Sequence, residues 1–122
     1  MNPRRAYTLT LSLLLLVEGV LGLFSPVVFG ILATNILHAV IHIALGIVGI
    51  WAANTGRFRG YLLFVGFLLL TVGALWFVSG VQDLIIRLLN VNHAVAIMNV
   101  VVGTVSLLMG SVATPFNTRR PK

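Results

Sequence analysis

Four long apolar stretches, separated by short polar segments, dominate the chain. They cover residues 7–24, 33–53, 61–78 and 92–113. A helix needs roughly 20 apolar residues to cross the hydrocarbon core of a bilayer, and each stretch approaches or exceeds that length. The pattern therefore predicts an all-α membrane protein in which residues 1–122 form a single domain of four transmembrane helices.

The two segments expected on the outer side of the membrane are short. Residues 25–34 carry no charge, and Pro26 and Gly30 predict a break between the first two helices. Residues 79–91 are amphipathic, with Leu84, Ile85, Leu88 and Leu89 set against Gln82, Asp83 and Arg87. This segment is either a short helix in the outer membrane interface or an extension of the third or fourth helix.

A weak internal repeat divides the chain into two units. A shift of 57 residues aligns Asn35 with Asn92, Ala39 with Ala96, His42 with Asn99 and Gly46 with Gly103. Each unit contains two apolar stretches, so the repeat predicts tandem helical hairpins over residues 1–56 and 57–122, related by a pseudo-two-fold axis along the membrane normal. The basic N-terminus also fits a cleaved secretory signal, but the repeat requires the first helix, and we expect it to be retained.

Positive charge is concentrated at one end of the four stretches. The basic residues at that end are Arg4, Arg5, Arg57, Arg59, Arg119, Arg120 and Lys122. Since cytoplasmic loops of membrane proteins are enriched in Lys and Arg, both termini and the middle loop are expected in the cytoplasm. We therefore expect a multi-pass protein of the bacterial cytoplasmic (inner) membrane.

Composition excludes several other classes. Hydrophobic residues make up 59% of the chain and charged residues only 8%, with a mean hydropathy of +1.10, which a water-soluble domain of this length cannot bury. The net charge of +6 comes mostly from short basic groups beside the membrane spans, where lipid headgroups are the expected partners rather than nucleic acid. The absence of cysteine excludes disulfides and thiolate chemistry.

Small and polar residues recur at steps of three, four or seven along the last three helices. In lipid, helices associate by close approach at such residues. The expected helix-packing positions are Asn35, Gly46, Gly49, Gly66, Gly73, Gly80, Asn99, Gly103 and Gly110. The large aliphatic residues of the other faces, Leu69 among them, are expected to meet lipid.

One acidic residue, Glu18, interrupts the first helix. An ionised carboxylate at this depth costs at least ~2.5 kcal/mol, so it should pair within the protein or be protonated. At a rise of 1.5 Å per residue, Glu18 lies about 16 Å from the cytoplasmic end, at the level of His38 and His42 in the second helix. The sequence thus predicts a buried polar cluster of Glu18, His38 and His42.

Three interpretations of this cluster stay open. The histidines can form a structural hydrogen-bonded pair with Glu18. The cluster can instead relay protons or bind a small polar solute. As the third alternative, His38 and His42, spaced by four residues, are candidate ligands for a metal, haem or pigment, although Glu18 supplies only one further ligand. No cofactor is predicted.

The polar positions of the second helix form a motif with regular spacing. It reads Asn35-x-x-His38-x-x-x-His42-x-x-x-Gly46-x-x-Gly49. With this motif, the chain resembles over most of its length a bacterial family of small four-helix membrane proteins known only as a domain of unknown function. The resemblance implies a fold and no activity. In the second unit, Val95 and Asn99 replace the two histidines.

Motifs of common enzymes are absent from the sequence. It contains no phosphate-binding loop, no dinucleotide fingerprint, no H-E-x-x-H and no serine nucleophile beside a histidine and an acid. We therefore do not expect an enzyme. The preferred function is a structural or accessory subunit that packs as a homo-oligomer or within a larger membrane complex. The alternatives are proton or small-solute handling through Glu18, His38 and His42, and cofactor or pigment binding by the histidines.

Overall fold

The computed structural model describes residues 2–111, which are mostly helical. The elements are α1 (Pro3–Gly22), β1 (Val27–Val28), β2 (Leu32–Ala33), α2 (Ile36–Thr55), α3 (Phe58–Leu75), α4 (Gln82–Leu89) and α5 (His93–Ser111). Four of the helices, α1, α2, α3 and α5, are long and apolar enough to cross a membrane. The predicted all-helical fold, with four helices long and apolar enough to cross a membrane, is confirmed at this level.

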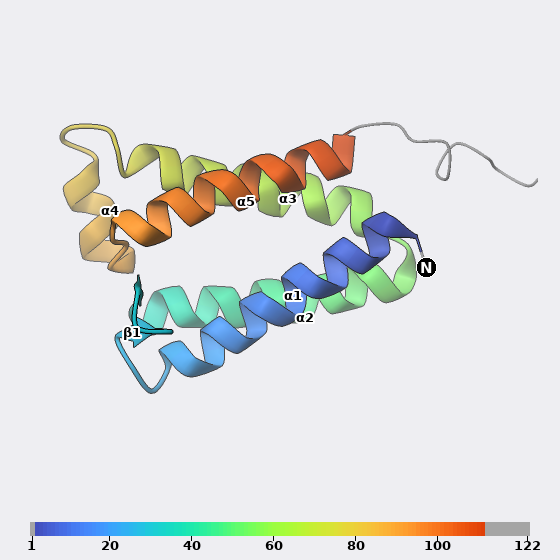
Figure 1. Ribbon diagram of the computed structural model, residues 1–122, viewed down its shortest axis with the longest axis horizontal. Coiled ribbons are helices and arrows are strands. Elements are labelled where there is room, and N and C mark those ends of the chain that lie inside the picture. The colour runs from blue at the N-terminus through green and yellow to red at the C-terminus, as the bar shows by residue number, and fades with distance from the viewer. Residues whose placement is uncertain (1, 112–122) are drawn as a thin grey trace, which may run out of the picture.

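The long helices lie side by side in two pairs (Figure 1). Most contacts between long helices are within the pairs α1/α2 and α3/α5, and the few contacts between the pairs come mainly from α3. One end of the bundle, the α4 end, carries α4 and the two short strands. The opposite end, the N-terminal end, carries the start of α1 and the turn between α2 and α3.

Glycines allow the backbones within each pair to approach closely. A Cβ added to Gly46 would lie 2.7 Å from the Ser12 carbonyl oxygen of α1, and one on Gly73 would lie 2.7 Å from the Ala96 carbonyl oxygen of α5. Of the glycines expected at packing positions, those that lie against a neighbouring helix are Gly46, Gly49, Gly66, Gly73, Gly103 and Gly110. Gly19 makes a similar approach to α2 and was not among the predicted positions.

Three expected positions differ in the structure. Gly80 lies beyond the end of α3, in a turn at φ +87°, with no atom within 4 Å of an added Cβ, so it packs against nothing there. Asn35 precedes α2 and caps it, because its side chain accepts a hydrogen bond from the His38 amide. Leu69 is only 6% exposed instead of facing lipid, since it lies three residues after Gly66 and therefore on the same helix face.

The strand pair was not predicted from the sequence. Val27 pairs with Ala33 and Val28 with Leu32, and between them Phe29 and Gly30 take the left-handed φ values of 55° and 75°. The predicted break after α1 therefore contains a small hairpin rather than an irregular loop. The segment after α3 forms a separate short helix, α4, and is therefore not an extension of the third or fourth long helix.

Arg4 and Arg5 were expected before the first helix, and they lie inside α1. Arg4 is 1% exposed, and its Nε donates to the Met109 carbonyl oxygen at 2.6 Å, near the C-terminal end of α5. The Nε of Arg5 donates to the Ala53 carbonyl oxygen at 3.1 Å, near the C-terminal end of α2. Cations at helix C-termini satisfy free carbonyls and oppose the helix dipole, so both arginines tie α1 to another helix.

Candidate functional site

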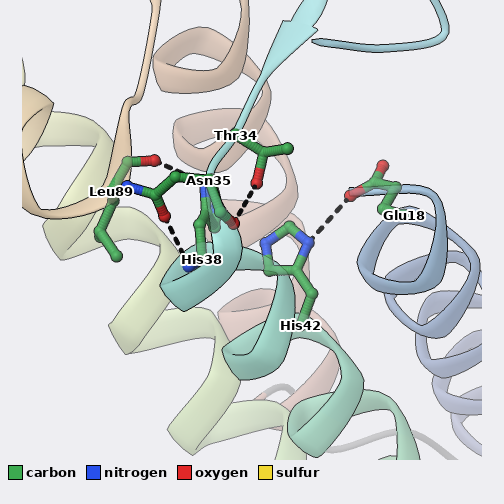
Figure 2. A network of polar contacts seen from close by, with 6 residues as sticks. All are labelled: Glu18, Thr34, Asn35, His38, His42 and Leu89. Atoms are coloured by element: carbon green, nitrogen blue, oxygen red, sulfur yellow. Dashed lines mark hydrogen bonds and ion pairs between the residues drawn. The ribbon is translucent and has the colours of Figure 1, made fainter. Parts of the chain in front are cut away.

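Glu18 of α1 and His42 of α2 face each other inside the bundle. The Oε1 atom of Glu18 lies 3.3 Å from Nδ1 of His42, and the two residues are 5% and 9% exposed (Figure 2). The neighbouring Gly19 explains how they meet, since an added Cβ there would lie 2.7 Å from the Ala39 carbonyl oxygen of α2. This close approach of the two backbones brings a carboxylate within reach of an imidazole.

His38, one turn before His42, has a different partner. Its Nδ1 lies 3.0 Å from the carbonyl oxygen of Leu89, at the end of α4. The two imidazole rings touch edge to face, with their centroids 4.4 Å apart. The structure therefore pairs Glu18 with His42, and His38 connects that pair to α4.

Asn99 of α5 is a further polar residue at the same level of the bundle. It is 5% exposed, and among residues 2–111 its side-chain amide makes no hydrogen bond. Glu18, His38, His42 and Asn99 all line one cavity of about 20 Å³, enough for a single water molecule. The sequence repeat aligned His42 with Asn99, but it assigned Asn99 only to helix packing.

Two more cavities meet at His42 and Asn99, which lie where the two helix pairs face each other. A cavity of about 120 Å³ lies between α2 and α3, and its other lining residues are mainly aliphatic. A smaller one of about 20 Å³ lies between α1 and α5 and also borders Glu18. The packing between the pairs is thus loosest around these two polar side chains.

Asparagine side chains close the site at the α4 end. The amide nitrogens of three asparagines donate to backbone carbonyls: Asn35 to Leu88 at 2.9 Å, Asn90 to Thr34 at 2.8 Å, and Asn92 to Ile31 at 3.0 Å. These three bonds, here called the asparagine latch, join the α1/α2 unit to α4 and the start of α5. The sequence repeat aligned Asn35 with Asn92, but it did not indicate that these side chains donate to backbone carbonyls, and it did not mark Asn90.

The arrangement gives little support to a metal centre. The part of the chain from residue 2 to residue 111 contains no group of three or more His, Cys, Asp or Glu side chains placed to hold a metal ion. The Nδ1 atoms of His42 and His38 are already directed at Glu18 and at the Leu89 carbonyl. A metal bound by this histidine pair would need ligands from elsewhere.

Comparison of the chain with models of protein families, with curated proteins and with solved structures finds no match.

Proposed function

We propose that the chain is a small multi-pass membrane protein that binds a proton or a small polar solute between its two helix pairs. The observation that carries the proposal is the buried Glu18–His42 pair, 3.3 Å apart, beside the unbonded amide of Asn99 in a common cavity. Ionisable residues inside a membrane are costly and mark ion, proton or solute sites.

The three side chains supply complementary chemistry. A carboxylate accepts hydrogen bonds or a proton, an imidazole donates or accepts through either nitrogen, and an amide does both. If the Glu18–His42 pair served packing alone, apolar residues of similar volume would hold α1 and α2 together at least as well. A cavity of about 20 Å³ beside the pair admits one small ligand.

The first prediction concerns the proton on Glu18. The chain has only two acidic residues, Glu18 and Asp83, so their carboxyl signals are separable in infrared difference spectra. We expect Glu18→Gln to remove the carboxyl signal that appears when Glu18 takes up a proton, together with the proton flux of proteoliposomes, while the protein stays folded. The exposed Asp83→Asn is the control and should keep both. Undiminished flux and an unchanged carboxyl signal in Glu18→Gln would refute the proposal.

A structural or accessory role is the second candidate, in a homo-oligomer or a larger membrane complex. It is supported by large aliphatic and aromatic side chains left exposed along the helices, as at Phe64 and Phe67, because a partner helix could cover them. A complex that stays intact in a mild, non-denaturing detergent, together with no proton flux in proteoliposomes of the wild-type protein, would favour this candidate over the first.

The two helix pairs also support the proposal of two tandem hairpins, residues 1–56 and 57–122, related by a pseudo-two-fold axis. In this arrangement the aligned His42 and Asn99 come from equivalent helices, α2 and α5. Substrate sites of proteins built from such repeats lie near the bilayer midplane, where the repeats meet. The shared cavity of His42 and Asn99 fits this rule.

The second prediction concerns orientation in the bacterial inner membrane. Arg57 lies in the turn at the N-terminal end and Arg59 in the first turn of α3, so we propose that this end and both chain termini face the cytoplasm. The chain has no cysteine, so single replacements label cleanly. An impermeant thiol reagent should modify the exposed Ser79→Cys in intact cells and Thr55→Cys only after permeabilisation. The opposite labelling pattern would reverse the topology.

A further inference from the structure

The cavity of about 120 Å³ between α2 and α3 has an aliphatic wall and one polar corner. Ile41 and Leu45 of α2 and Leu68, Leu69 and Val72 of α3 form most of the wall. An apolar cavity of ~150 Å³ in a protein core stays dry and binds benzene. The size and lining of this cavity therefore suit a single six-membered ring better than a cluster of water molecules.

The polar corner is made by His38, His42 and Asn99. The Nδ1 atom of His38 is already directed at the Leu89 carbonyl oxygen. All three side chains are at least nine-tenths buried, and within the described residues the Asn99 amide makes no hydrogen bond. An apolar occupant would cover this amide without bonding to it, which is unfavourable, so an occupant with a hydroxyl or carbonyl group at this corner is favoured over a plain hydrocarbon. The occupant thus combines an apolar ring with one hydrogen-bonding group.

The edge of the cavity indicates how the occupant enters. Ile41, Leu68 and Val72 are half-buried, so the cavity reaches the surface between α2 and α3, within the membrane-spanning part of the bundle. No Asp, Glu, Lys or Arg lines it. A ligand that arrives from the hydrocarbon core and meets no fixed charge is uncharged.

We propose that this cavity binds a small uncharged ring compound that carries one hydroxyl or carbonyl group and enters laterally from the bilayer. The ring packs between α2 and α3, and its polar group bonds to His42 and Asn99. The cavity does not border Glu18, but His42 and Asn99 belong both to this cavity and to the proposed proton site, so we expect binding of the ring compound to depend on Glu18 only through His42.

Thermal unfolding of the purified full chain in detergent tests the proposal, with phenol, benzene and benzoate as probes. Phenol at ten times its dissociation constant should raise the melting temperature by roughly 5 °C in a saturable way. Benzene should give a smaller rise and benzoate none. Absence of a saturable rise with phenol would overturn the proposal.

Three variants locate the site. Val72→Phe fills the cavity and should abolish the rise in melting temperature with phenol. Ile47 is 57% exposed on the outer face of α2, so Ile47→Phe should retain this rise. Asn99→Leu should weaken phenol binding about fivefold and leave benzene binding unchanged, as expected for one lost hydrogen bond. Equal phenol shifts in Val72→Phe and the wild type would show that phenol acts through the detergent or another site.

Two further measurements keep the test decisive. If Val72→Phe does not fold, the single-methylene filling Val72→Ile replaces it, and competition of phenol with the fluorine NMR signal of 4-fluorophenol reports one saturable site. Glu18→Gln should bind phenol as the wild type does. Loss of proton flux in this variant with phenol binding intact would show that phenol occupies the cavity between α2 and α3 without needing Glu18. Loss of both would show that the ring compound binds through Glu18 and would overturn the proposal.

Discussion

Replacing His42 with leucine is expected to destabilise the folded protein by about 3–5 kcal/mol, the cost of removing one partner of a buried ion pair. The reason is the burial of Glu18, which is 5% exposed and has its only ion-pair partner within residues 2–111 in His42, at 3.3 Å. Without the imidazole, the carboxylate must take up a proton or stay charged in an apolar surrounding. Unfolding in mixtures of a mild and a denaturing detergent measures the loss in free energy of unfolding.

A double-mutant cycle is the control for this prediction. Glu18→Leu combined with His42→Leu removes both members of the pair, so the double variant should be more stable than His42→Leu alone. A double variant as unstable as the sum of the two single variants would show that the side chains do not interact.

Gly103→Leu is expected to have an effect of similar size through packing. A Cβ at this position would lie 2.5 Å from the backbone nitrogen of Leu70 and 2.8 Å from the carbonyl oxygen of Gly66. Overpacking of a core commonly costs ~1–3 kcal/mol, and here the obstacle is the backbone of α3, which cannot rotate away as a side chain does. We therefore expect a loss of at least about 3 kcal/mol, or separation of α3 from α5.

Gly60→Leu is the matched control, because α3 also contains Gly60 and no atom lies within 4 Å of a Cβ added there. This variant should unfold at the same fraction of denaturing detergent as the wild type, or at a slightly higher fraction, since leucine favours helix more than glycine does. Similar tolerance of leucine at both glycines would contradict the assignment of Gly103 to a helix crossing.

The four long helices could be predicted because the thickness of the bilayer core sets both the length and the apolar composition of a helix that crosses it. Their ends could not. α1 begins at Pro3 because Asn2 caps it, accepting a hydrogen bond from the Arg4 amide, and this places both arginines inside the helix. Their guanidinium groups then bond to carbonyls of α5 and α2, contacts between residues 105 and 48 positions apart along the chain. A charge pattern read along the sequence does not contain such contacts.

The candidate site shows the same limit. Counting the rise along the helices places Glu18 at the level of both histidines but does not select between them. The choice depends on the rotation of α2 about its axis and on the carbonyl oxygen of Leu89, which lies within hydrogen-bond distance of the Nδ1 atom of His38. A backbone acceptor has no signature in the sequence, because every residue carries one.

The sequence repeat held part of the information on Asn99 and on the latch asparagines. The repeat that aligned His42 with Asn99 already marked a polar position equivalent to a site residue, and Asn92 occupied the place equivalent to Asn35. The β1–β2 hairpin left no such trace, since each strand has only two residues.

The asparagine latch and the two arginines of α1 share one property that bears on how such a sequence can change over evolutionary time. In most of these bonds a side chain donates to a main-chain oxygen, as Asn92 does to Ile31 and Arg4 does to Met109. The identity of the accepting residue is therefore free to drift among apolar types, whereas the donors are not. Distant relatives of this protein should be recognisable by the spacing of a few asparagines and arginines, even where nearly every aliphatic position between them has been exchanged.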